Sequence, residues 1–241
     1  MERGHRVADD DVYLNETYFE NPKEIHKFVG NLVAEEGRSA PCHLLDVGCA
    51  IGERIHYMQQ RFPTFAYTGM DVSTAMIERA GALNPRADFR LGSVLDPGAI
   101  PERAYDIVIC GGVLAIFDDI AGPIHNLLSR AREGGSVYLS DTFNNDPIDV
   151  IMRYRRVSEE GGGDWEIGWN VFSKITVERL LRATGRVGAL SWHDFRLPFD
   201  LPKRADVMRT WTLRTENNPH QIVNGAAQIL DVSVVRAEIR G

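Results

Sequence analysis

Two acidic residues and two glycines stand at the ends of short apolar runs, where they could bind a ligand. Asp46, Gly48 and Gly52 lie at or just after the run 43–47, and Asp71 ends the next apolar run. Gly48 allows a sharp turn after a strand, and Gly52 would open a helix and permit close backbone approach to a ligand. A carboxylate at the position of Asp71 can accept hydrogen bonds from both hydroxyls of a ribose. The pattern predicts a nucleoside-binding site at strand ends.

The glycine spacing and the sign of the charge separate two classes of nucleoside ligand. A dinucleotide favours the pattern G-x-G-x-x-G and places its pyrophosphate at the start of the helix. Here the pattern is Gly48-x-x-x-Gly52, and Asp46 would stand beside the pyrophosphate. Like charges in a partly desolvated site repel by kcal/mol rather than tenths. A donor that carries a positive ammonium and a positive sulfonium suits Asp46 better.

The elements that would position these residues alternate between strand and helix. Parallel neighbours require a crossover, so the alternation predicts a doubly wound, mostly parallel α/β sheet with helices on both faces. Ser73 is well placed to cap one of the helices. An amphipathic helix over 22–36 precedes the sheet. The predicted strands are 43–47, 65–70, 87–91, 105–110 and 136–140, and the predicted helices are 53–62, 73–83 and 120–132.

The rhythm changes after Asp141. A lid-like insertion is expected at about 143–172, followed by a helix over 176–185. Beyond it the period is two, which predicts strands at 187–195, 209–215, 221–224 and 229–239, forming an antiparallel hairpin region that closes the sheet. The expected organisation is a helical cap segment at 1–38 and one domain at 39–241.

The ordered set of motifs resembles the class I S-adenosylmethionine-dependent methyltransferases, which have a seven-stranded α/β sheet. Residues 45–52 are similar to motif I of that family, Asp71 to its ribose-binding acid, and 92–96 to its adenine-binding turn. Residues 105–114 resemble its fourth strand and exit loop, and 132–135 its glycine turn before the fifth strand. The likeness spans about residues 40–141, and it implies S-adenosylmethionine as cofactor and methyl transfer as activity.

The residues and the resemblance together predict the cofactor contacts. Two positions depart from the family pattern. Ala50 stands where glycine is common, and it is tolerable if its φ is negative. Ser93 stands where an acid is common, and its hydroxyl can still hydrogen-bond the adenine amino group. The predicted contacts are Asp46, Gly48, Cys49, Gly52, Asp71, Val72, Met76, Ser93, Val94, Cys110 and Gly111.

An acceptor site is expected between the first segment, the end of the fifth strand and the insertion. Aromatic walls with a few polar groups suit a small organic acceptor. A hydroxyl acceptor benefits from a base, and His193, in an aromatic cluster near a strand end, is the predicted catalytic residue. The predicted substrate contacts are Tyr18, Asp141, Asn144, Trp165, Trp169 and Trp192. No metal site is expected.

The expected acceptor atom is an oxygen of a sugar or secondary metabolite, and methylation of nitrogen or carbon is an alternative. The alternatives are a NAD(P)-dependent oxidoreductase and a protein that binds the cofactor without catalysis and serves as a partner.

Composition bounds the partners and the compartment. The net charge is −7 and no Lys/Arg cluster stands out, which disfavours nucleic acid. No apolar run approaches the roughly 20 residues of a membrane span. Three cysteines without metal-type spacing and no visible secretory signal predict reduced thiols in a cytoplasmic protein. A monomer or a homodimer is expected.

Overall fold

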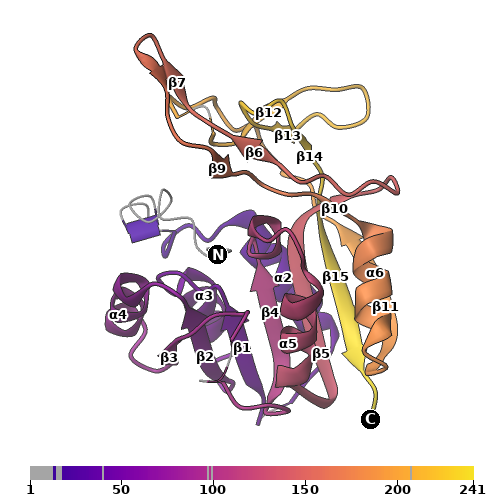
Figure 1. Cartoon of the computed structure of the whole chain (residues 1–241). Helices are drawn as coiled ribbons and strands as arrows, with labels where there is room; N and C mark the ends of the chain where they lie inside the picture. The colour runs from indigo at the N-terminus through magenta and orange to yellow at the C-terminus, as the bar shows by residue number, and fades with distance from the viewer. Residues whose placement is uncertain (1–12, 15–17, 40, 97, 99, 207) are drawn as a thin grey trace.

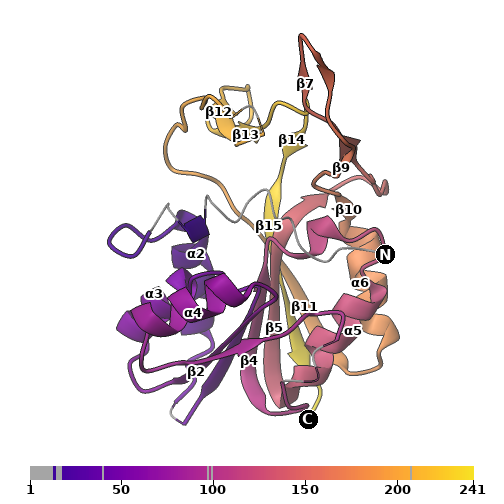
Figure 2. The same cartoon turned by 60° about the vertical axis from the view of Figure 1, so that its left-hand side comes forward.

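The computed structural model describes residues 13–14, 18–39, 41–96, 98, 100–206 and 208–241. A central sheet crosses the molecule (Figures 1 and 2). Its strands are β1 (His43–Val47), β2 (Ala66–Asp71), β3 (Asp88–Leu91), β4 (Tyr105–Gly111), β5 (Ala131–Asn144), β11 (Val187–Asp194) and β15 (Val232–Ile239). They lie in the order β11-β15-β5-β4-β1-β2-β3, and a short strand, β10 (Phe172–Ser173), pairs with β5 off this path.

Most neighbours in the sheet run parallel, and β15 is the exception. The pairs β2–β3, β1–β2, β1–β4 and β4–β5 are parallel, whereas β15 is antiparallel to both β5 and β11. The predicted α/β sheet with antiparallel pairing near the C-terminus is therefore confirmed. The carboxyl ends of β1, β2, β4 and β5 meet at one edge, which is where ligands bind in such sheets.

Helices cover both faces of the sheet (Figure 2). They are α2 (Glu24–Glu35), α3 (Glu53–Arg61), α4 (Thr74–Leu83), α5 (Ala121–Arg130) and α6 (Lys174–Ala183), with a 3-10 turn η2 (Leu114–Ile116) after β4. Helices α2, α3 and α4 lie on one face and α5 and α6 on the other. As predicted, Ser73 caps α4, because its side chain accepts a hydrogen bond from the Met76 N–H.

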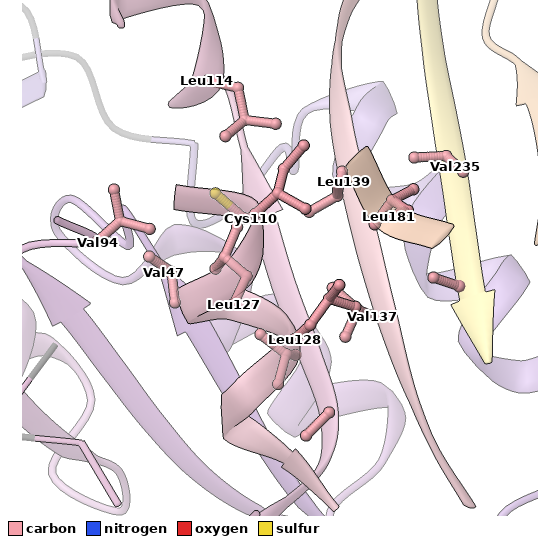
Figure 3. Close-up of a cluster of buried hydrophobic side chains, with 14 of the residues drawn as sticks. Val47, Val94, Cys110, Leu114, Leu127, Leu128, Val137, Leu139, Leu181 and Val235 are labelled. Atoms are coloured by element: carbon pink, nitrogen blue, oxygen red, sulfur yellow. The ribbon is translucent and has the colours of Figure 1, made fainter. Parts of the chain in front are cut away.

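The core consists of two apolar clusters, one on each face of the sheet. In β4, Ile107 and Ile109 join one cluster, while Val108 and Cys110 join the other. This alternation follows from the period of two in a strand. Figure 3 shows side chains of the second cluster, from the strands, α5 and α6, pointing toward one another. The clusters hold the strand ends in fixed positions.

A second region lies above the carboxyl ends of the strands (Figure 1). We call residues 145–171 and 195–231 the upper region. Its short strands pair β6 (Arg153–Tyr154) with β9 (Glu166–Ile167) and β7 (Val157–Ser158) with β8 (Gly161–Gly162). A further sheet has the order β12 (Trp211–Leu213), β13 (Gln221–Val223), β14 (Ile229–Leu230).

This region corrects one sequence prediction. Residues 209–215 and 221–224 were expected to close the central sheet, but β12 and β13 form a separate sheet with β14. The predicted strand 229–239 is divided at Asp231, and its two parts, β14 and β15, pair with different sheets. A period of two identifies a strand but does not specify its partner, and that is why the prediction failed.

No helix in the described ranges has the length and apolarity that crossing a membrane requires.

Candidate active site

A cavity of about 430 Å³ opens at the carboxyl ends of β1, β2, β4 and β5. Its size lies within the roughly 300–1,000 Å³ of small-molecule sites. It sits between β1 and β4, where the crossover direction reverses, and α2 and the upper region contribute further wall residues. This is the switch point at which open α/β sheets bind ligands.

At two positions in the cavity wall, a glycine leaves space that the Cβ of any other residue would fill. Gly48 has φ +71°, and a Cβ there would overlap the Val113 side chain. A Cβ on Gly111 would come within 2.5 Å of both Arg54 Nη2 and Ser140 Oγ. Side chains at these positions would fill space that the cavity now occupies or disturb its walls.

Asp71 is held at the cavity edge by backbone donors. The Ala50 N–H donates to Asp71 Oδ2 at 2.9 Å, and the Ser73 N–H donates to Oδ1 at 3.1 Å. A carboxylate has about four acceptor positions, so each oxygen keeps one for a ligand hydroxyl. Ala50 itself has φ +46°, so the expectation of a negative φ is wrong. This left-handed conformation costs roughly 1–2 kcal/mol for alanine, and it points the Ala50 N–H at Asp71.

Asp46, at the end of β1, has a cationic partner that the sequence analysis did not predict. It forms a buried ion pair with Arg54 of α3. Burial raises the pKa of Asp46 above its ordinary value, and the guanidinium counteracts this. Asp46 Oδ2 and Arg54 Nε have no hydrogen-bond partner among the described residues. The pair therefore offers one unused acceptor and one unused donor beside the cavity.

His26 of α2 also lines the cavity, and the sequence analysis missed it. Its Nδ1 has no hydrogen-bond partner within the described part of the chain. Burial lowers the pKa of His26 well below 6.5, and the positive charges of Arg54 and Lys23 lower it further. The helical spacing could have predicted this position, because His26 lies on the same apolar face of α2 as Val29 and Val33.

Asp141 lies at the end of the parallel run of β5, buried in the cavity wall. The Ala115 N–H donates to Oδ2 at 3.2 Å, and the Thr142 N–H donates to Oδ1 at 2.9 Å. Burial nevertheless raises the pKa of Asp141 to about 6. Its carboxyl thus links β5 to the turn η2 and titrates near neutrality.

The structure brings most of the predicted cofactor contacts into this one cavity. Asp46, Gly48, Cys49, Asp71, Val72, Met76, Ser93, Val94 and Gly111 all line it. Two others are placed elsewhere. Cys110 is buried in the apolar cluster (Figure 3), and Gly52 is the left-handed N-cap of α3, where a Cβ would meet Asn84 and Phe89.

The predicted acceptor contacts divide in the same way. Asp141 and Trp169 line the cavity. Trp165 lies in the upper region, 65% exposed, with the Arg155 guanidinium over its ring. Asn144 ends β5 and hydrogen-bonds the Ile148 carbonyl, and Tyr18 donates its N–H to Glu53.

His193 and Trp192 lie on β11, the strand at the edge of the sheet, and neither is a cavity residue. His193 Nε2 is 2.9 Å from Ser191 Oγ, and Trp192 donates its indole N–H to Glu178. A general base needs hydrogen-bond reach of the acceptor. His193 lacks that position in this structure.

Among the described residues, no group of three or more His, Cys, Asp or Glu side chains could hold a metal ion.

Comparisons with known proteins show which proteins this chain is similar to. Residues 45–137 match a family model described as a methyltransferase domain. Trans-aconitate 2-methyltransferase of Methylobacterium radiotolerans is 34% identical over 124 residues, which are 51% of this chain and 46% of that protein. Isonocardicin synthase of Nocardia uniformis is 38% identical over 117 residues, 47% of this chain and 36% of that protein. The chain thus spans about half or less of the length of these relatives.

Solved structures agree on the fold. Magnesium protoporphyrin IX methyltransferase from Synechocystis PCC 6803, with bound SAM, has a TM-score of 0.54 at 14% identity, covering 90% of this chain and 79% of that one. Residues 45–137 therefore match a methyltransferase domain, and the chain has the α/β fold seen in S-adenosylmethionine-dependent methyltransferases. The cavity residues fit that cofactor: a carboxylate for the ribose at Asp71, and the unused acceptor of Asp46 for an ammonium.

Proposed function

We propose that this protein transfers the methyl group of S-adenosylmethionine to an oxygen atom of a small organic acceptor. The observation that supports this most directly is the shared cavity. The family-matched motifs at the ends of β1, β2 and β4 line it together with residues of α2 and the upper region. Donor and acceptor would therefore meet in one enclosed space.

The donor half of the cavity matches S-adenosylmethionine group by group. Asp71 would accept both ribose hydroxyls, and Ser93 would hydrogen-bond the adenine amino group. The ammonium would donate to Asp46 Oδ2, and the carboxylate would accept from Arg54 Nε, atoms that are buried without partners among the described residues. Burying such atoms unpaired costs about 1–3 kcal/mol each, so pairing them with the donor favours binding.

The acceptor half is mainly apolar. Ile25, Phe117, Trp169 and Phe195 line it. The cations nearby already have partners, since Arg54 pairs with Asp46, and Lys23 pairs with Glu53 at 2.9 Å. An acceptor with several carboxylates would meet Asp46 and Asp141 without a spare cation. We therefore propose a largely apolar acceptor with a neutral hydroxyl, in place of a tricarboxylate such as trans-aconitate.

Methyl transfer is an in-line displacement, in which the acceptor oxygen approaches the methyl carbon opposite to sulfur. Holding the two reactants in line supplies much of the acceleration, because effective molarities of oriented groups reach roughly 10⁵–10⁸ M. The strand ends would hold the donor, and the apolar residues of the cavity would limit the access of water to the reacting atoms.

Calorimetry with S-adenosylhomocysteine tests the donor site. The wild type is expected to bind it saturably, and Asp71→Ala is expected to weaken binding at least tenfold, which corresponds to about 1.4 kcal/mol for the lost ribose hydrogen bonds. Asp88→Ala, an exposed acid on the neighbouring strand β3, is the matched control and should bind like the wild type. Absence of binding by the wild type would refute the proposal.

The transferred group needs its own measurement, because isonocardicin synthase, one similar protein, is not named a methyltransferase. Mass spectrometry after incubation with S-adenosylmethionine and an apolar alcohol should show a product heavier by one CH₂. Binding without any product would favour a non-catalytic partner protein, and tight binding of NAD or NADP would favour an oxidoreductase. A monomer or homodimer, a cytoplasmic location and a role in secondary metabolism stay predictions.

A further inference from the structure

His26 occupies an unusual position in the cavity wall. It comes from α2, outside the family-matched residues 45–137, and its ring is 6% exposed. Its Nδ1 has no hydrogen-bond partner in the described ranges. A buried imidazole normally has partners that fix its tautomer, so a missing one indicates a position reserved for a ligand or for proton transfer.

The acidic groups of the same wall are already engaged. Asp46 pairs with Arg54, and Asp71 accepts two backbone N–H groups. Asp141 likewise accepts two backbone N–H groups. Glu53 pairs with Lys23 and accepts the Tyr18 N–H at 2.6 Å. Taking a proton would weaken each of these interactions, whereas His26 Nδ1 has no hydrogen bond to give up among the described residues.

The wall around His26 also indicates the kind of acceptor. Ile25, its neighbour on α2, lines the cavity together with Phe117, Trp169 and Phe195. Aromatic rings prefer to pack against such rings in stacked or edge-to-face geometry, which contributes about 0.5–1.5 kcal/mol beyond area burial. An aromatic alcohol would place its ring against this wall and its hydroxyl toward the polar end.

We propose that His26 is the general base of the reaction and accepts the proton of an aromatic hydroxyl as the oxygen attacks the methyl carbon. This inference rests on the proposed methyl transfer. The O–H bond breaks and its proton passes to the imidazole, while an oxygen lone pair forms the new O–C bond. The electron pair of the broken C–S bond stays on sulfur, which becomes a neutral thioether.

The charges near His26 are consistent with this role. Burial, and after it the charges of Arg54 and Lys23, lower the pKa of His26, so the imidazole is neutral at neutral pH and its Nδ1 lone pair or proton site is not already taken by an added proton. The carboxylates of Asp46, Glu53, Asp71 and Asp141 line the same cavity. Because the sulfonium loses its positive charge in the same step, the cavity gains no net charge.

Two phenols that differ in acidity test the base directly. At about pH 8.5 unsubstituted phenol is almost fully protonated, like a tyrosine side chain, whereas 4-nitrophenol is largely ionised and needs no base. In His26→Gln, which keeps a polar side chain of similar size, the ratio of kcat/KM for phenol to that for 4-nitrophenol is expected to fall about 100-fold, the contribution of a positioned base. A ratio cancels any loss of folded protein.

Asp141→Asn is the matched comparison, because it removes another buried cavity group that could exchange a proton, the carboxyl whose pKa burial raises to about 6. It is expected to lower both rates together and to leave the ratio unchanged. A ratio that is unchanged in His26→Gln, or lowered by Asp141→Asn alone, overturns the inference. So does a wild type that binds S-adenosylhomocysteine but methylates neither phenol. If the wild type fails to bind S-adenosylhomocysteine, the proposed function fails with it.

NMR of histidine-labelled protein provides a readout that does not depend on turnover. In the complex with S-adenosylhomocysteine, the His26 ring, identified by the signal that is missing in His26→Gln, should be neutral at neutral pH. A ring that remains protonated to about pH 8 could not accept the proton, and that result overturns the inference.

Discussion

The central sheet and the upper region are built by different means. In β4, six successive residues, 105–110, are buried, and helices cover both faces of the sheet. In the upper region the strands have two or three residues, and Val157 and Ile229 are 73% and 70% exposed. The first region is stabilised by apolar burial, and the second depends more on hydrogen bonds and contacts with the first. The proposed donor site lies at the strand ends of the first region, whereas part of the proposed acceptor wall comes from the second.

One residue shows how the two regions are joined. Asn170 is fully buried, and its N–H donates to the Ala115 carbonyl at 2.8 Å. Its side-chain amide donates to the Phe117 carbonyl at 2.7 Å and accepts from the Met152 N–H at 2.8 Å. A single polar side chain therefore fastens the upper region to the turn after β4.

The largest difference in the free energy of unfolding is expected when an ion pair is broken in each of the two regions. Asp46→Ala leaves the buried Arg54 charge without its partner, so the free energy of unfolding should fall by about 3–5 kcal/mol. Arg156→Ala breaks the Arg156–Asp206 pair of the upper region, which is half exposed, and should cost less than about 1 kcal/mol. Urea unfolding of both variants measures this, and equal losses would contradict the comparison.

Asp141, where the two regions meet, should give an effect that depends on pH. Burial raises the pKa of Asp141 from 3.8 to about 6, so within that window the folded chain holds a proton that the unfolded chain has lost. The free energy of unfolding therefore falls as pH rises through the window, by about 3 kcal/mol in total. Asp141→Asn should remove this fall. Denaturant unfolding at about pH 4 and pH 7 measures the difference, and parallel curves for the two proteins would count against it.

The smallest difference in the free energy of unfolding is expected between substitutions of one glycine in each region. A Cβ on Gly69 in β2 would lie 2.6 Å from the Phe89 ring and 2.8 Å from Cys49 Sγ, so Gly69→Ala should lower the free energy of unfolding by about 1–3 kcal/mol. A Cβ on Gly163 in the upper region would lie 3.7 Å from the Arg156 carbonyl oxygen, and Gly163 has no left-handed φ. Gly163→Ala should therefore change the free energy of unfolding by no more than about 0.5 kcal/mol. Thermal unfolding of the pair is sufficient, and a larger loss in Gly163→Ala would show that the upper region is packed as tightly as the sheet.

The same contrast explains what the sequence could predict. Strands such as β1 and β4 follow from local hydrophobic patterns, and the ordered glycines and acids predicted a ligand site at their ends, where the structure has a cavity. The pairing of β12 with β13, away from the central sheet, depends on contacts that no local pattern encodes. The Asp46–Arg54 pair was missed because Arg54 reads as an ordinary helix residue. His26 was missed because attention went to histidines near strand ends, whereas α2 carries it into the cavity.

The division of the last predicted strand at Asp231 has a mechanical consequence. The carbonyl of Asp231 accepts the Phe143 N–H, its carboxylate accepts from Gln221, and the next residue begins β15. One backbone thus passes from the small sheet into the second strand of the large one with a single residue between them. Force applied to β14 would be transmitted along β15 to β5, and so to Val232 and Asp141 in the cavity wall.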